Sequence, residues 1–376
     1  MFLPDILFGS SIRSIRFFYS FLLLPFLSSP ETSTEIKDQH TTAITFPPRK
    51  KGALVVQTSK GKDKFYEFDT TFQPNATQEQ VAAQVMPLVQ SAIDGFNVCI
   101  FAYGQTGSGK TYTMTGADGG KLNKEEVELY GITPRSIVEL FKISQASGHH
   151  EIQFYFSMVE LYRGELLDLF KDKNDKNKKK KSTAIDKENA TNGGKKNAKK
   201  MKEVSTKLSV KRDPATGVVH IENVNKIQVD SPEALHALIK RGNDSRHTSS
   251  TKMNDTSSRS HLVMTIYCES RNTTSNVTTS GKLNLVDLAG SERQSKTGAT
   301  GAVFEESKSI NKSLSVRYFI VVVVVSCDSV VLLCFIFMLH IFNNTPQCFV
   351  NRDIFFTLTV FDLIFKMIWR LHNYRR

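Results

Sequence analysis

Cysteine is scarce and unpaired in this sequence. The chain of 376 residues holds five cysteines, and none of them is spaced as a CxxC pair or as a set of metal ligands. This absence argues against a disulfide-stapled secreted domain and favours a reducing compartment. Cys99 and Cys268 lie within apolar, strand-like runs, and we expect both to be buried free thiols.

An evenly spread positive charge is also lacking. The formal net charge is +12, but residues 171–203 hold thirteen lysines against five acidic residues, so +8 of the excess belongs to that segment. The remainder is only mildly basic, and we expect no nucleic-acid partner. The segment has too few apolar residues to form a core, and we predict a disordered surface insertion. A solvated loop is the simpler interpretation, and an electrostatic tether to an acidic polymer is the alternative.

A secretory cleavage site is missing too. The apolar run from Phe17 to Leu27 follows Arg13 and Arg16, which is the outline of a signal peptide. No small-x-small site comes after it. We therefore do not predict a secreted protein.

The most informative stretch that is present is Gly104–Thr111, whose sequence GQTGSGKT fits the Walker A spacing G-x-x-x-x-G-K-[ST]. The apolar run Val98–Tyr103 before it predicts a strand, and a helix start follows. In that context backbone N–H groups surround phosphate oxygens, Lys110 reaches the β- and γ-phosphates, and Thr111 binds Mg²⁺. A glycine-rich turn that matches by chance is the alternative. The predicted nucleotide-binding residues are Gly104, Gln105, Thr106, Gly107, Ser108, Gly109, Lys110 and Thr111.

Alternating strand and helix patterns surround this loop. Thr77–Gln80 is a capping-box helix start. Apolar residues then recur at helical spacing, which predicts one buried face: Val81, Val85, Leu88, Val89, Ala92 and Ile93. Further helices are expected at 133–141 and 231–242, and strands at 53–57, 64–69, 151–161, 208–211 and 218–222.

Two polar blocks downstream point to phosphoryl transfer. Asn254–His261 precedes the predicted strand Leu262–Cys268, and Asp287–Glu292 follows the predicted strand Gly281–Val286. Hydroxyls, an arginine and a strand-terminal aspartate are the groups that this chemistry needs beside a P-loop, because catalysis rests on positioning and charge stabilisation. Each block alone could be a serine-rich turn or a strand end, but the two in this order are specific.

These motifs resemble the nucleotide site of the kinesin motor domain, with a P-loop, an N-x-x-S-S-R-S-H switch I and a D-L-A-G-S-E switch II. Four further segments also look like that family: 88–97, 131–135, 158–162 and 307–315. The sequence of these motifs is most similar to the C-terminal-motor, minus-end-directed class, especially the plant calmodulin-binding type. The resemblance covers about residues 44–315, interrupted by the lysine-rich insertion.

The resemblance implies an α/β P-loop NTPase with a mainly parallel central sheet and helices on both faces, incomplete here at both ends. It also implies ATP and Mg²⁺ as cofactors, microtubule-stimulated ATP hydrolysis, and binding to tubulin coupled to movement. The expected location is the cytoplasm, on the microtubule cytoskeleton. Calmodulin is a further partner in full-length relatives. Myosin-like and Ras-like NTPases are disfavoured by the Asn254–His261 block.

The resemblance also implies roles for individual residues. Ser258 joins Thr111 at Mg²⁺, with Asp287 in the outer shell, and Ser257 helps to place the attacking water. The Gly290 N–H contacts the γ-phosphate.

Further roles concern closure of the site and the microtubule surface. Arg259 and Glu292 form an ion pair that closes the site, for which a planar guanidinium is suited. His261 either packs against switch I or contacts nucleotide. Lys296 and Lys312 are the candidate contacts with acidic tubulin, and solvated surface lysines are the alternative.

The two ends of the sequence depart from the family. No R-x-R-P strand precedes Ile44, no neck helix comes ahead of it, and no A-L-G-x-V-I continues after Ser315. We interpret residues 1–43 as a leader unrelated to the family and 316–376 as an unrelated apolar tail, both consistent with translated intron. We therefore expect the sheet to lack its first strand and its last elements.

A membrane anchor is the alternative interpretation of the tail. Tyr318–Phe342 exceeds the roughly 20 apolar residues that cross a bilayer. Asp328 lies near its middle, however, at a cost of roughly 2.5–3.5 kcal/mol for insertion. We therefore do not expect a membrane partner. Besides a working motor, the sequence allows a nucleotide- and microtubule-binding remnant without motility.

Overall fold

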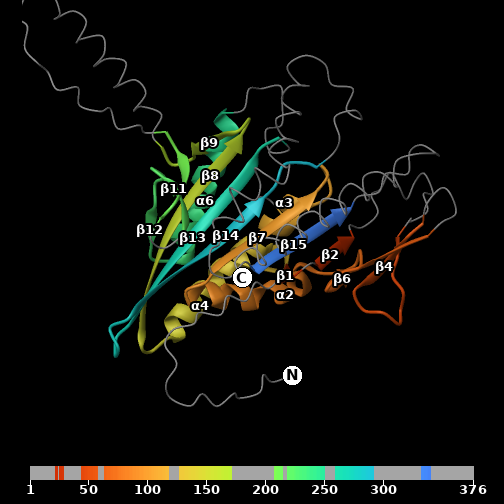
Figure 1. Cartoon of the computed structure of the whole chain (residues 1–376), viewed down its shortest axis with the longest axis horizontal. Coiled ribbons are helices and arrows are strands. Elements are labelled where there is room, and N and C mark those ends of the chain that lie inside the picture. Colours follow the sequence, from red (N-terminus) through yellow and green to blue (C-terminus); the bar gives the residue numbers. More distant parts are fainter. Residues whose placement is uncertain are drawn as a thin grey trace, which may run out of the picture.

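A ten-stranded mixed sheet forms the centre of the molecule in the computed structural model (Figure 1). The structure describes residues 22–23, 25–28, 44–57, 63–117, 127–171, 207–214, 218–249, 259–291 and 332–339. The order along the sheet is β12-β8-β13-β14-β7-β15-β2-β6, with β9 on β8 and β1 on β15. The strands are β1 (Leu22–Leu23), β2 (Pro25–Ser28), β6 (Thr70–Phe72), β7 (Asn97–Gly104), β8 (His150–Tyr162), β9 (Glu165–Asp168), β12 (Ile227–Val229), β13 (His261–Asn272), β14 (Thr278–Asp287) and β15 (Leu332–Leu339).

One half of the sheet is parallel and the other is antiparallel. The strands from β6 through β2, β15 and β7 to β14 pair in parallel, whereas β14, β13, β8 and β12 pair antiparallel. In the parallel pair of β7 and β14, Asp287 lies opposite Ala102. Because parallel strands end at the same edge, the register brings the last residue of β14 beside the loop that follows Gly104.

Strands β2 and β15 come from the two segments that we predict to be unrelated to the family. Strand β15 pairs with β7 from Leu332 opposite Val98 to Met338 opposite Gly104, and β2 lies between β15 and β6. The sheet therefore has no gap at these positions, in contrast to our expectation, because apolar runs pair with the otherwise open edge of β7. The assignment of 1–43 and 316–376 to unrelated sequence stays a prediction.

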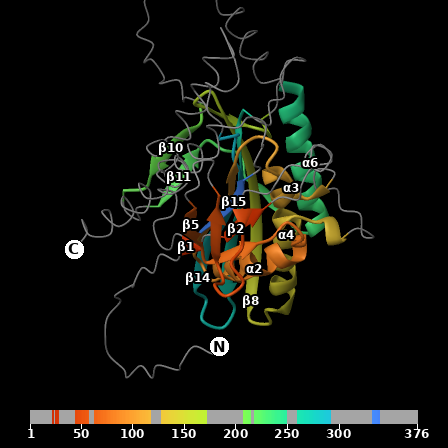
Figure 2. The same cartoon turned by 90° about the vertical axis from the view of Figure 1, so that its right-hand side faces the viewer.

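The described helices lie on one side of the sheet (Figure 2). They are α2 (Gln78–Ile93), α3 (Lys110–Thr115), α4 (Ile132–Ala146) and α6 (Pro232–Ser249), with a short 3₁₀ turn η2 (Val127–Leu129) before α4. On the other side lies the hairpin of β10 (Ser209–Arg212) and β11 (Val219–Glu222). A small separate sheet consists of β3 (Ile44–Thr45), β4 (Ala53–Val56) and β5 (Lys64–Glu67). Apart from Lys171, the predicted insertion at 171–203 lies outside the described residues. Among the described helices, none has the length and apolar character needed to cross a bilayer.

Helix α2 confirms the capping-box prediction. The Thr77 hydroxyl accepts from the Gln80 N–H at 3.2 Å, and the Thr77 N–H donates to Oε1 of Gln80 at 3.0 Å. The six predicted core positions are all buried, and this face packs on β7, β14 and α4. Gly281 of β14 lies directly against the Ala92 carbonyl, where a Cβ would have no room. The missing side chain at Gly281 therefore allows the end of α2 to lie close against β14.

Helix α6 is longer than its sequence predicts. We expected the helix to end at Gly242, whereas it continues to Ser249. A Cβ at Gly242 would overlap the Met158 side chain of β8, so this glycine serves close packing of helix on strand and does not end the helix. The extra turns carry Arg246 over β8.

Both thiols in the described core behave as predicted. Cys99 on β7 and Cys268 on β13 are buried and are not in disulfides. Burial raises the pKa of the Cys268 thiol to about 12, which keeps it protonated.

Candidate nucleotide site

The P-loop connects the end of β7 to the start of α3. Gly107 and Gly109 have φ values of +79° and +91°, in the left-handed region that only glycine adopts without strain. Gly109 is the N-cap of α3, and the Thr113 N–H closes the first helical turn onto its carbonyl at 2.9 Å. The sequence GQTGSGKT thus forms the tight turn between strand and helix that the Walker pattern predicts.

The Lys110 side chain folds back across this loop. Its ammonium group donates to the Gln105 carbonyl at 2.8 Å, and the residue is 8% exposed. The Ser291 N–H donates to the Gly104 carbonyl at 3.1 Å. A buried positive charge therefore lies within the loop, and residues 288–291, which follow β14, are joined to the start of the loop.

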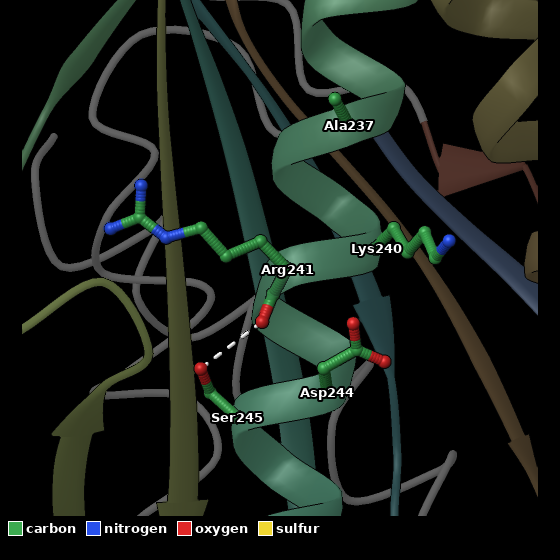
Figure 3. Close-up of a pocket in the computed structure, with 5 residues that line it drawn as sticks. All are labelled: Ala237, Lys240, Arg241, Asp244 and Ser245. Atoms are coloured by element: carbon green, nitrogen blue, oxygen red, sulfur yellow. Dashed lines mark hydrogen bonds between the residues drawn. The ribbon is translucent and has the colours of Figure 1, made fainter.

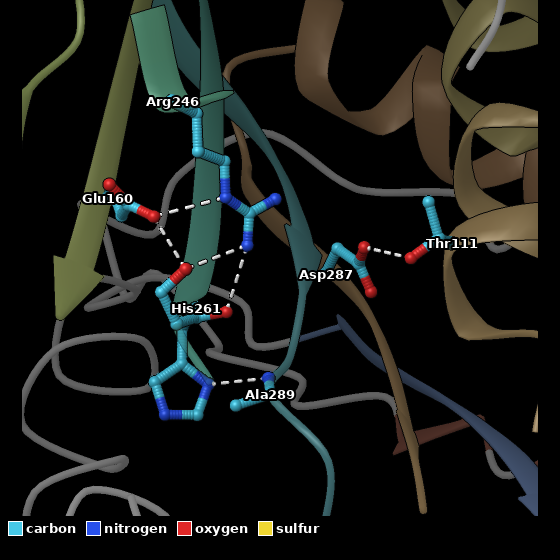
Figure 4. Close-up of polar contacts among 7 residues, drawn as sticks. Thr111, Glu160, Arg246, His261, Asp287 and Ala289 are labelled. Carbon is cyan, nitrogen blue, oxygen red and sulfur yellow. Dashed lines mark hydrogen bonds and ion pairs between the residues drawn. The ribbon is translucent and has the colours of Figure 1, made fainter. Parts of the chain in front are cut away.

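Thr111 and Asp287 meet at the edge of the sheet, as Figure 4 shows. The Thr111 hydroxyl donates to Oδ2 of Asp287 at 2.6 Å. Burial raises the pKa of Asp287, and the Thr111 hydrogen bond and the charges of Lys110 and Arg246 act in the opposite direction. Among the described residues, Oδ1 of Asp287 and Oγ of Ser108 are buried without a hydrogen-bond partner. A hydroxyl, a buried carboxylate with an unused oxygen and a buried ammonium group fit a magnesium-bound nucleotide.

His261 joins the first residue of β13 to the segment after β14. Its Nδ1 accepts a hydrogen bond from the Ala289 N–H at 3.0 Å. Burial, with smaller contributions from the charges of Arg246 and Lys110, lowers the pKa of His261 to about 4. The ring is therefore neutral near pH 7, as an acceptor at Nδ1 requires. The structure thus joins His261 to the segment that follows β14. The two interpretations that the sequence left open, packing against switch I and contact with nucleotide, stay predictions.

A buried ion pair lies beside this histidine. Nε of Arg246 donates to Oε1 of Glu160 at 3.1 Å, and Nη2 of Arg246 donates to the hydroxyl of Ser260 at 2.9 Å. Sequence reasoning missed Glu160 and Arg246 as part of the site and gave Ser260 no role beyond its place in the Asn254–His261 block. The sequence feature that could have revealed the ion pair is Glu160, since a carboxylate inside the apolar strand run 158–162 requires a buried partner.

The comparisons with known proteins agree with the geometry. The family model for the kinesin motor domain matches residues 28–322. This chain belongs to the kinesin motor domain family. It is 43% identical over 255 residues to kinesin-like protein KIN-14I of Oryza sativa subsp. japonica, which covers 68% of this chain and 17% of that protein. It is 39% identical over 258 residues to kinesin-like protein KIN-14E of Arabidopsis thaliana, again with 68% and 17% covered.

Solved kinesin structures share the fold. The motor domain of the Kar3-like kinesin from Ashbya gossypii superimposes with a TM-score of 0.62 at 25% identity, covering 91% of this chain and 97% of that one. The structure of a fast kinesin gives a TM-score of 0.65 at 24% identity, covering 84% of each chain. The predicted family and the predicted P-loop fold class are thus confirmed. The chain spans only 17% of the length of the two plant relatives.

The described residues include part of the site that the kinesin resemblance predicts. The P-loop, Asp287 and Gly290 lie together at the edge of the sheet, with Gly290 buried next to Ala289. Arg259 is half-buried just before β13. The roles of all these residues stay predictions. The other predicted site residues lie outside the described part of the chain: Ser257, Ser258, Glu292, Lys296 and Lys312.

A surface hollow lies along α6 (Figure 3). It has a volume of about 450 Å³ and is lined by Ala237, Lys240, Arg241, Asp244 and Ser245. The Ser245 hydroxyl donates to the Arg241 carbonyl at 3.0 Å, one turn back along the helix. All five lining residues belong to α6, and none of them is a P-loop residue.

Proposed function

We propose that this chain is a kinesin motor domain that binds ATP with Mg²⁺, hydrolyses it, and couples hydrolysis to microtubule binding and movement. The observation that carries the proposal is the Thr111–Asp287 hydrogen bond beside the P-loop, with a buried and unused Asp287 oxygen. Membership of the kinesin motor domain family supports the same reaction.

The chemistry follows from what these side chains can hold. Lys110 exchanges its bond to the Gln105 carbonyl for the β- and γ-phosphates, and a cation at that point offsets the charge on the transferring phosphoryl group. Thr111 and Ser258 would hold Mg²⁺ through their hydroxyls, with Asp287 in the outer shell. When bound, Mg²⁺ supplies charge neutralisation across the phosphates.

The remaining roles concern water and closure of the site. Ser257 positions the attacking water, and the Gly290 N–H donates to the γ-phosphate. Arg259 and Glu292 pair to close the site, which excludes bulk water and strengthens each of these interactions. The protein itself provides positioning and charge, and little covalent chemistry is required of it.

The partner that we propose is the microtubule. Lys296 and Lys312 supply positive charge toward the acidic tubulin surface. This activity places the protein on the cytoplasmic microtubule cytoskeleton. Calmodulin is proposed only as a partner of full-length relatives, through segments outside the matched region.

The experiment is ATP turnover by the whole chain with and without microtubules, compared with Lys110→Ala. We expect microtubules to stimulate turnover and Lys110→Ala to abolish it. Lys142→Ala is the matched control, because Lys142 is an exposed lysine on α4. Turnover that microtubules do not stimulate, or nucleotide binding without turnover, would instead identify a remnant without motor activity.

A further inference from the structure

The Arg246 side chain lies in a closed ring of hydrogen bonds (Figure 4). The Arg246 and Glu160 side chains are 8% and 2% exposed, and their Nε and Oε1 atoms are 3.1 Å apart. Nη2 of Arg246 donates to both the hydroxyl and the carbonyl of Ser260, at 2.9 and 3.1 Å. The Ser260 hydroxyl in turn donates to the same Glu160 oxygen at 2.5 Å. The end of α6, the strand β8 and the start of β13 therefore meet at one guanidinium group.

The main consequence of this ring is geometrical. A buried ion pair adds little to stability over a well-packed apolar pair, because desolvation offsets most of the attraction. A planar guanidinium that holds a carboxylate and a serine at once does, however, fix their relative positions. Arg246 and Ser260 are 14 residues apart in the chain, so the ring also holds together the two ends of the segment that contains switch I.

The ring continues to the nucleotide-binding edge through the backbone. Ser260 directly precedes His261, and His261 accepts the N–H of Ala289. Ala289 directly precedes Gly290 and lies two residues after Asp287. The charge of Arg246 also contributes to the lowered pKa of His261 and opposes the rise in the pKa of Asp287. Arg246 is thus connected to switch II by contacts and by charge, although it does not contact the P-loop residues in these interactions.

We propose that Arg246 is a positioning residue that acts through Ser260 and His261 to hold residues 288–291 where the Gly290 N–H meets a third phosphate. The inference rests on the proposed function for the role of Gly290. Its consequence is selective: the Arg246 ring favours binding of a nucleoside triphosphate over a diphosphate. A ring that only stabilised the fold would affect both nucleotides alike.

The test compares the affinities of the whole chain for ADP and for a non-hydrolysable ATP analogue, each with Mg²⁺, by calorimetry. Arg246→Lys keeps the positive charge beside Glu160, but one ammonium group cannot reproduce the planar fork. We expect affinity for the ATP analogue to fall by about tenfold or more, the scale of one lost hydrogen bond to a charged group. Affinity for ADP should change by less than about twofold.

Two further variants make the assignment specific. Ser260→Ala keeps the ion pair and removes the hydroxyl, so it should lower the triphosphate preference in the same direction. If Arg246 acts through Ser260, the double variant should lose no more preference than Arg246→Lys alone, because the two changes break one network. The matched control is Arg241→Lys on the same helix, whose guanidinium contacts the Phe170 carbonyl and not Ser260. It should leave the preference unchanged.

The outcomes separate this inference from the proposed function. Equal weakening of ADP and ATP-analogue binding in Arg246→Lys, or no change in either, overturns the inference even if the wild type is an active ATPase. The wild type could prefer the ATP analogue over ADP and yet not turn over ATP. In that case, loss of this preference in Arg246→Lys supports the inference while the proposed function fails. If Arg246→Lys does not fold, the same comparison with Ser260→Ala decides the question.

Discussion

The Thr111 hydroxyl and the Asp287 carboxylate lie 2.6 Å apart although 176 residues separate them in the chain. The parallel register of β7 and β14 brings them together, because both strands end at the same edge and α3 starts there. Burial of Asp287 raises its pKa and leaves Oδ1 without a partner among the described residues. An unused buried carboxylate oxygen is costly, and a metal-bound water would satisfy it.

Asp287→Asn should therefore reduce magnesium-dependent ATP turnover more than it destabilises the fold. The amide keeps the size of the side chain and an acceptor for Thr111, but it removes the negative charge near the metal. We expect ATP turnover to fall by about 100-fold or more, the scale of one lost electrostatic contact in a catalytic site, and the Mg²⁺ concentration for half-maximal turnover to rise. Turnover measured against Mg²⁺ concentration checks this, with the exposed Asp94→Asn as the control. An unchanged Mg²⁺ dependence would contradict the assignment of Asp287.

His261 should make the folded state sensitive to acid. Its pKa is about 4 in the folded state and about 6.5 when exposed, so the unfolded state binds the proton more tightly. The resulting stability is complete above about pH 6.5 and is lost as the pH falls toward 4, by on the order of 3 kcal/mol. His236 shifts in the same direction, and the raised pKa of Asp287 has the opposite effect, so the comparison must be between variants.

His261→Gln keeps an acceptor for the Ala289 N–H and cannot titrate. Urea unfolding of the wild type and His261→Gln at several pH values between 4 and 7 should show that the variant loses less stability on acidification. Parallel pH profiles for the two proteins would mean that His261 does not carry this dependence.

Gly242→Ala should destabilise the protein although alanine is the better helix former. Alanine gains roughly 1 kcal/mol in helix propensity, but its Cβ overlaps Met158 where α6 crosses β8, and such overpacking costs about 1–3 kcal/mol or more. Thermal unfolding should show a lower Tm for Gly242→Ala, partly restored by Met158→Ala. Gly148→Ala is the control, since a Cβ there meets no atom within 4 Å. A rise in Tm for Gly242→Ala would show that the helix can move away from β8.

The sequence was sufficient wherever the signal was local. The capping box at Thr77, the buried face of α2 and the Walker loop depend on residues within a few positions of one another, and all three are present in the structure. Asp287 could be placed at a strand end for the same reason. Local patterns have a fixed geometry, so their spacing alone determines which groups meet.

Pairings over long distances could not be predicted in this way. Glu160 and Arg246 are 86 residues apart, and neither has a neighbour in sequence that indicates its partner. Gly242 was interpreted as a helix end because nothing in the sequence shows that Met158 packs against it. In each case the deciding contact is tertiary and overrides the local preference.

The position of strand β15 also depends on pairing between distant segments, which could not be predicted from the sequence. It pairs in parallel with β7 over seven residues. Without β15, the P-loop strand β7 would keep its pairing with β14 but would have an open edge on the side of β2. A chain that ends at residue 331 should therefore aggregate or lose stability, because an uncovered apolar edge strand is a template for further pairing. Sedimentation and thermal unfolding of the shortened and whole chains check this. A shortened chain that stays monomeric, with the same Tm and nucleotide affinity, would show that β15 is dispensable. That result would support the prediction that family-like sequence ends near residue 315.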